Sequence, residues 1–177
     1  MDWTRDIPNP WTTVSSTEVY RNTWTSVRED RLQGPDGSDG LYGYFDRKDA
    51  AMVLPLFPDG STILVRQWRY AFERATWELI GGGLDGDEDP RAGAERELAE
   101  EGGLRAARWT ALGRLCHSDA RVRGELHCFL AEDLSETSAG PEASECDLVR
   151  ARVSLADCVA AVDDGRIDMV STAWVIL

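Results

Sequence analysis

The residues whose chemistry stands out lie at positions 82–104, where eight of twenty-three residues are carboxylates and only two are arginines. Three of these acids, Glu97, Glu100 and Glu101, have the i, i+3, i+4 spacing that brings side chains together on one helix face. Like charges held this close repel one another, and a bound divalent cation would remove the repulsion. Hard ions such as Mg²⁺ and Mn²⁺ prefer carboxylate oxygens and also hold phosphates, so the spacing indicates a metal site. The plainer alternative is a solvated acidic helix face.

Two charged residues and a glycine triplet stand where they could complete such a site. Arg96 adjoins the three acids and can hold a carboxylate through two parallel hydrogen bonds. Glu88 precedes the expected helix and can reach the same site from the loop. The loop Gly81, Gly82 and Gly83 has backbone amides that can approach substrate phosphates closely. A glycine loop alone is a weak signal, and the acids beside it make it more specific.

One helix and the strands around it must position these residues. The helix is expected to begin at Asp89-Pro90, since Asp is a good N-cap and Pro suits the first helical position, and to end at Gly102-Gly103. The expected strands are 51–56, 62–68, 77–80, 109–116, 126–131 and 148–153. A second helix is expected over 155–163, and a last helix or turn over 169–177. This mixture predicts an α/β or α+β sandwich.

The N-terminal quarter of the chain has a different character. Short strands are expected over 17–22, 24–29 and 41–45, with a strong turn cluster before the third. They predict a small antiparallel sheet placed before the main core. Three tryptophans in this region could stack on a nucleobase or fill an interface, and we favour packing: Trp3, Trp11 and Trp24.

Length, composition and charge limit the kinds of protein and binding partner that the sequence is compatible with. A chain of 177 residues suits one domain of ordinary size, and 42% apolar with 29% charged residues is ordinary globular usage. The net charge of −13 disfavours nucleic acid and anionic membrane surfaces as partners. No secretory leader or membrane span is visible in the sequence. Four widely spaced cysteines without a C-x-x-C pair indicate reduced thiols in the cytoplasm rather than a zinc site.

The acidic segment also matches a known pattern, and on it the sequence resembles the Nudix hydrolases. Every defined position of the Nudix box is present: Gly82, Glu88, Arg96, Glu97, Leu98, Glu100, Glu101, Gly103 and Leu104. The resemblance implies an α/β/α sandwich around a mixed sheet over residues 49–177, with residues 1–48 as an added N-terminal sheet. It also implies hydrolysis of a nucleoside diphosphate linked to another group, with Mg²⁺, or Mn²⁺ in its place. The implied metal ligands are Glu97, Glu100, Glu101 and the carbonyl oxygen of Gly81, with Arg96 and Glu88 holding the cluster.

Segments outside the box resemble the branch of ADP-ribose and nucleotide-sugar pyrophosphatases. They are residues 65–70, 77–82, 129–134 and 165–168. This branch implies a homodimer formed through the N-terminal sheet. It implies that Arg69 binds the diphosphate, with Arg66 as a weaker candidate; the alternative for Arg69 is an ordinary surface arginine. Glu78 could face the metal site or form a salt bridge within its strand.

The branch also implies a glutamate on a late loop, as general base or as an extra metal contact, and the acidic loop over 135–146 could act as a lid. Glu145 is the first candidate and Glu142 the second, and the alternative is a solvated acidic loop. One departure puts ADP-ribose in question, because residues 118–120 lack the proline that such enzymes carry there, and Glu125 is a candidate for a glutamate of that segment. The alternatives are another nucleoside diphosphate derivative (GDP-mannose, a UDP-sugar or a dinucleotide) or a nucleotide-sugar sensor without hydrolysis. The intact box argues against a sensor.

Overall fold

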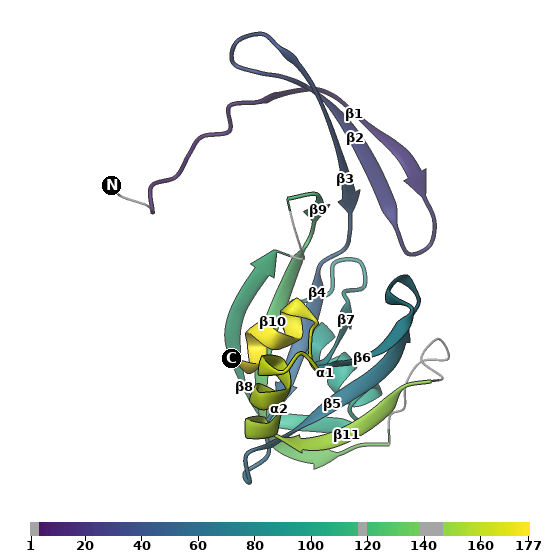
Figure 1. The fold of residues 1–177 in the computed structure, drawn as a ribbon, viewed down its shortest axis with the longest axis vertical. Helices are drawn as coiled ribbons and strands as arrows, with labels where there is room; N and C mark the ends of the chain where they lie inside the picture. The colour runs from purple at the N-terminus through teal and green to yellow at the C-terminus, as the bar shows by residue number, and fades with distance from the viewer. Residues whose placement is uncertain (1–3, 117–119, 139–146) are drawn as a thin grey trace. The chain divides into compact units, whose positions relative to one another are not determined.

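The computed structural model describes residues 4–116, 120–138 and 147–177, which divide into two compact units (Figure 1). The smaller unit contains residues 4–47 and 120–124, and the larger contains 48–116, 125–138 and 147–177. Within these described residues, no helix is both long and apolar enough to span a membrane.

The smaller unit is a four-stranded sheet in the order β1-β2-β3-β9 (Figure 1). Its strands are β1 Thr12–Arg21, β2 Ser26–Gln33, β3 Asp39–Asp46 and β9 Val122–Arg123. The first three pair antiparallel, which confirms the predicted N-terminal sheet, and β9 joins β3 in parallel. The predicted bounds of the first two strands were wrong. Residues 22–25 form the turn, because Asn22 Oδ1 accepts hydrogen bonds from the backbone N–H groups of Trp24 (2.8 Å) and Thr25 (2.7 Å).

This sheet has no apolar core of its own among the residues described. All ten residues of β1 are exposed. The exposed apolar side chains of the unit include Val14, Val19, Leu41 and Phe45. The buried hydrophobic residues of the described chain all belong to the larger unit. The smaller unit therefore leaves several large apolar side chains uncovered by its own described residues.

The larger unit is built on two sheets. Its strands are β4 Ala50–Pro55, β5 Ser61–Arg69, β6 Arg74–Glu78, β7 Ile80–Gly83, β8 Leu104–Cys116, β10 Glu125–Glu136 and β11 Val149–Ser154. One sheet has the order β7-β4-β10-β8 and is mixed, since β10 runs parallel to β4 while the other pairs are antiparallel. The other sheet, β11-β5-β6, is antiparallel, and the short 3-10 helix Tyr70–Phe72 lies at the tip of its β5–β6 hairpin.

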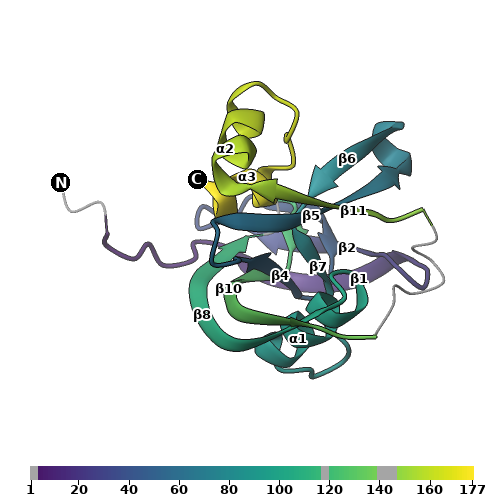
Figure 2. The ribbon, with the colours of Figure 1, turned by 90° about the horizontal axis from the view of Figure 1, so that it is seen from below.

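Helices cover both sides of these sheets. Within the larger unit, Figure 2 shows α1 (Pro90–Glu100) on one side and α2 (Leu155–Asp163) with α3 (Val170–Ile176) on the other. Two buried apolar clusters correspond to the two sides. Leu98 of α1 packs with residues of β4, β5 and β7, whereas Cys158 of α2 and Val175 of α3 pack with other residues of β4, β5 and β10. This arrangement confirms the predicted α/β/α sandwich.

The ends of α1 follow the expected chemistry. Asp89 Oδ1 accepts hydrogen bonds from the backbone N–H groups of Arg91 (3.0 Å) and Ala92 (3.1 Å), and Pro90 takes the first helical position. The chain leaves the helix through Gly103, whose φ of +66° is a left-handed conformation that glycine adopts easily. Strand β8 then begins at once, at Leu104 rather than at residue 109, because it pairs with β10 along nearly its full length. The predicted strand over 77–80 is likewise two strands, which separate at Leu79.

Candidate active site

The guanidinium of Arg96 gathers three of the predicted carboxylates around it. Its Nε and Nη2 donate to the two oxygens of Glu88, at 3.1 and 3.0 Å. Its Nη1 donates to Glu97 Oε1 at 2.7 Å and to Glu100 Oε2 at 3.2 Å. Nη2 also donates to the carbonyl oxygen of Gly83 at 3.0 Å. One side chain on α1 therefore joins the loop, the helix and strand β7.

The glycines of β7 lie directly against the acids of α1. The backbone N–H of Gly81 donates to Glu101 Oε2 at 2.8 Å. A Cβ added to Gly82 would lie 2.4 Å from Glu97 Oε1, and one added to Gly81 would lie 2.4 Å from the carbonyl oxygen of Ala51. A side chain at Gly81 would clash with the backbone of β4, and one at Gly82 would displace the Glu97 carboxylate. A Cβ on Gly83 would meet nothing within 4 Å.

Glu88 holds the loop that leads into α1. Its Oε2 accepts a hydrogen bond from the backbone N–H of Asp85 at 3.0 Å, while both oxygens accept from Arg96. The hydrogen bond from Arg96, followed by that from Asp85, lowers the pKa of Glu88, and the same pairing with Glu88 raises the pKa of Arg96. Both groups are therefore charged at neutral pH.

The donor set of this cluster fits a hard divalent cation. Glu97 and Glu101 are only 6% and 4% exposed, and Glu97 shares Arg96 Nη1 with a third carboxylate, Glu100. Buried carboxylates in this number need compensating positive charge, and Arg96 supplies one such charge. Oxygen donors from carboxylates beside an open glycine backbone are the ligands that Mg²⁺ and Mn²⁺ prefer.

Two of the predicted substrate-binding residues form a pair with each other. Arg69, at the end of β5, donates from Nε to Glu78 Oε1 at 2.7 Å and from Nη2 to Glu78 Oε2 at 2.9 Å. Glu78 is 8% exposed and lies at the end of β6, two residues before β7. Arg66 points elsewhere, since its guanidinium lies 5.7 Å from the ring centre of Trp77. Glu142 and Glu145 lie outside the described residues.

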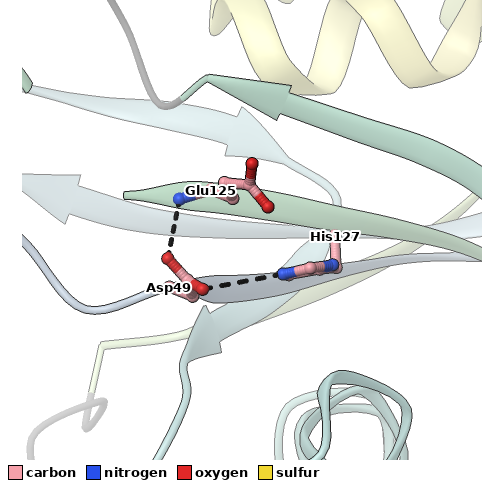
Figure 3. A group of neighbouring side chains, drawn as sticks. All are labelled: Asp49, Glu125 and His127. Carbon is pink, nitrogen blue, oxygen red and sulfur yellow. Dashed lines mark hydrogen bonds and ion pairs between the residues drawn. The ribbon is translucent and has the colours of Figure 1, made fainter. Parts of the chain in front are cut away.

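A second polar cluster lies where β4 and β10 begin (Figure 3). Asp49 Oδ1 accepts from the backbone N–H of Glu125 at 2.8 Å, and its Oδ2 lies 3.8 Å from His127 Nε2. The donor atoms of the three side chains lie within 4.8 Å of one another, which is close enough to share a metal ion. Glu125 is already paired with Arg114 at 2.8 Å. These contacts explain the cluster as a structural link between the starts of two parallel strands. Asp49 and His127 were missed in the sequence, because only the parallel pairing of β4 and β10 brings them together.

Comparison with known families agrees with the fold and the box. A model of the NUDIX domain matches residues 46–171, and a model of the nucleoside diphosphate sugar hydrolase N-terminal domain matches residues 11–45. The chain therefore belongs to the Nudix family and is a Nudix hydrolase. This confirms both the resemblance and the class of enzyme that the box predicted.

Curated relatives cover most of the chain. It is 27% identical over 165 residues to an ADP-ribose pyrophosphatase of Bacillus subtilis, covering 93% of this chain and 89% of that protein. It is 29% identical over 158 residues to an ADP-ribose pyrophosphatase of Mycobacterium tuberculosis, with coverages of 88% and 76%. A methanol dehydrogenase activator of Bacillus methanolicus is 25% identical, with coverages of 88% and 84%. A crystal structure of an ADP compounds hydrolase superposes with a TM-score of 0.84 at 23% identity, covering 97% of this chain and 93% of that one, and shows the shared fold.

Proposed function

We propose that this Nudix hydrolase splits the diphosphate of a nucleoside diphosphate sugar, such as ADP-ribose, into a nucleoside monophosphate and a sugar phosphate. The observation that carries the proposal is the contact of Arg96 with Glu88, Glu97 and Glu100 beside the side-chain-free backbone of β7. The match of residues 11–45 to the N-terminal domain of nucleoside diphosphate sugar hydrolases supports the substrate class. Two relatives named ADP-ribose pyrophosphatase support ADP-ribose as the first substrate to test.

Nudix enzymes typically use a divalent metal, and we assign its ligands to Glu97, Glu100, Glu101 and the carbonyl oxygen of Gly81. Arg96 and Glu88 hold these carboxylates in place without binding the ion themselves. A bound Mg²⁺, or Mn²⁺ in its place, would neutralise diphosphate charge and lower the pKa of a coordinated water.

Residues around the box are assigned to substrate binding and proton transfer. Glu78 fixes the guanidinium of Arg69 through two hydrogen bonds, and a fixed guanidinium can then bind the diphosphate oxygens. Arg66 is a second candidate for this role, and the amides of Gly82 and Gly83 lie where they can approach a phosphate. In the reaction, the oxygen of a water forms a bond to one phosphorus while the bond from that phosphorus to the bridging oxygen breaks. A carboxylate, Glu145 or one of the box, accepts the proton.

The uncovered sheet of the smaller unit supports a homodimer. Its described residues leave Val14, Val19, Leu41 and Phe45 exposed on strands β1 and β3. Exposed apolar residues in this number mark an interaction surface. A second copy of this chain is the partner we propose for it, and we place the dimer in the cytoplasm, where the three described cysteines would stay as the free thiols they are here. Light scattering should give the mass of a dimer, and Leu41→Glu should shift it to that of a monomer.

A substrate panel tests the proposed reaction. Phosphate released after coupling to a phosphatase would be measured with Mg²⁺ and with EDTA. The panel would contain ADP-ribose, GDP-mannose, UDP-glucose, a dinucleoside polyphosphate and nucleoside triphosphates. A preference for ADP-ribose that EDTA abolishes is the expected result. Preference for another member would change the substrate, and binding without release across the panel would favour the sensor alternative.

A further inference from the structure

The strand that carries the glycines, β7, lies at the edge of its sheet, next to β4 alone. An edge strand points every second backbone N–H away from its neighbour, where it has no partner in the sheet. Leu79 is the one residue between β6 and β7 and belongs to no ladder pair, so its N–H also lacks a partner in the sheets. Gly81 donates to Glu101 Oε2 at 2.8 Å, and Leu79 donates to the hydroxyl of Thr172 at 3.1 Å.

The contact of Thr172 is deeply buried. Thr172 is 0% exposed and Leu79 is 2% exposed, so solvent cannot replace either partner. A buried N–H that loses its acceptor is costly, because it has already lost its hydrogen bonds to water. Thr172 belongs to α3, which the apolar side chains of Val175 and Ile176 anchor in the same cluster as Leu79. The acceptor is therefore held in place by the packing of its helix.

The edge of β7 is thus held from both sides of the sandwich. Glu101 directly follows α1, which lies on one side, and Thr172 belongs to α3, which lies on the other (Figure 2). The side chain of Leu79 packs in the cluster with α3, and that of Ile80 packs in the cluster with α1. The strand switches sheets at this point, since β6 pairs with β5 and β7 pairs with β4. No ladder hydrogen bond can fix the N–H of Leu79, and Thr172 supplies the one that does.

We propose that Thr172 is a positioning residue of the metal site: its hydroxyl fixes the peptide of Leu79, and so the placement of Gly81 against Glu101. The inference rests on the proposed function, in which Gly81 and Glu101 are metal ligands. Loss of the hydroxyl should weaken metal binding.

Three variants separate the hydroxyl from packing. Thr172→Val keeps the shape and removes the acceptor, and Thr172→Ser restores the acceptor. Thr62→Val is the matched control, because Thr62 is also 0% exposed and its hydroxyl has no hydrogen-bond partner among the described residues. Each purified full-length variant would be titrated with Mn²⁺ alone, with the free ion followed by electron paramagnetic resonance. The Mg²⁺ concentration for half-maximal hydrolysis would be measured beside it.

The expected result is a rise of about three- to tenfold in the Kd for Mn²⁺ in Thr172→Val, at the low end of what lost outer-shell contacts cause. Thr172→Ser and Thr62→Val should match the wild type, and high Mg²⁺ should restore most of the turnover of Thr172→Val. A folded Thr172→Val with the wild-type Kd, or a Thr172→Ser as weak as Thr172→Val, would overturn the inference. If Thr172→Val does not fold, Thr172→Cys, which keeps a weak acceptor, replaces it. Its Kd for Mn²⁺ should rise by less than the three- to tenfold expected of Thr172→Val, and an unchanged Kd would overturn the inference.

The proposed function can fail separately. A wild type that binds Mn²⁺ but hydrolyses no member of the panel would refute the substrate and leave the effect of Thr172 on Kd intact. A wild type that does not bind Mn²⁺ would refute both.

Discussion

The carboxylate of Glu97 lies where the side chain of residue 82 would be: a Cβ on Gly82 would stand 2.4 Å from its Oε1 and 2.9 Å from its Oε2. The glycine of β7 and the glutamate of α1 therefore form one unit, in which the strand makes room for the acid. Gly83, the next residue, faces no such constraint, since a Cβ there would meet nothing within 4 Å.

This difference predicts opposite outcomes for two adjacent substitutions. Gly82→Ala should displace the Glu97 carboxylate and reduce turnover by at least about tenfold, in line with losses on disturbing a metal site. Gly83→Ala should retain near wild-type turnover, because it adds a methyl group in open space. Steady-state hydrolysis at saturating Mg²⁺, with circular dichroism to verify folding, checks both. Equal activity of the two variants would contradict the geometry.

The Arg96–Glu88 pair should appear in the pH dependence of stability. The pKa of Glu88 lies below its ordinary value of 4.5, mainly because Arg96 donates to its carboxylate. The pair therefore stabilises the fold fully at pH values above the ordinary pKa of Glu88. This contribution to the free energy of unfolding is lost as the pH falls through the lowered pKa. Glu88→Gln should unfold more easily than the wild type at pH 7, and the difference should shrink in acid. Urea unfolding at several pH values measures it, and a difference that grew in acid would contradict the prediction.

Glu73 predicts a stabilising substitution. It has φ +51° and ψ +35°, a left-handed conformation that costs a non-glycine residue about 1 kcal/mol. Glu73→Gly should therefore raise the free energy of unfolding by up to about 1 kcal/mol, part of which the greater flexibility of unfolded glycine offsets. Glu73→Ala keeps the Cβ and serves as the control, with no gain expected. Thermal unfolding of both variants checks this, and a gain in Glu73→Ala alone would contradict it.

The cysteines predict an order of chemical labelling. Cys116 is exposed, whereas Cys128 and Cys158 are 0% exposed and burial raises the pKa of both thiols, that of Cys128 to about 11. Since the thiolate is the reactive form, iodoacetamide at pH 8 should modify Cys116 in the native protein and spare the other two until unfolding. Peptide mass spectrometry reads the order, and early labelling of Cys128 would contradict the packing around α2 and β10.

Most of the candidate site could be predicted from the sequence because it is local. Glu97 and Glu100 lie one and four positions after Arg96, and Glu88 lies eight positions before it in one loop–helix segment, so their contacts with Arg96 need no long-range pairing. The N-cap of α1 and its glycine end were readable for the same reason.

The parts that escaped prediction depend on contacts between distant segments. Thr172 reaches Leu79 across ninety-three positions, and His127 meets Asp49 only through the parallel register of β10 with β4. Neither residue type is distinctive, and no local pattern reports the register of parallel strands. The pairing of Arg69 with Glu78 was likewise not predicted, because the β5–β6 register sets Arg69 opposite Arg74 and Glu78 opposite Val65, although each residue was a candidate separately.

The most direct test of the metal-dependent hydrolysis compares Glu101, the C-cap of α1, with Glu95 on α1. Glu101→Gln keeps an oxygen that can accept from the Gly81 N–H but removes the charge a cation needs, whereas Glu95 is exposed and pairs with Arg91. With the best substrate of the panel and saturating Mg²⁺, Glu101→Gln should lose at least about a hundredfold in kcat while remaining folded, and Glu95→Gln should match the wild type. Wild-type turnover by a folded Glu101→Gln would contradict the account.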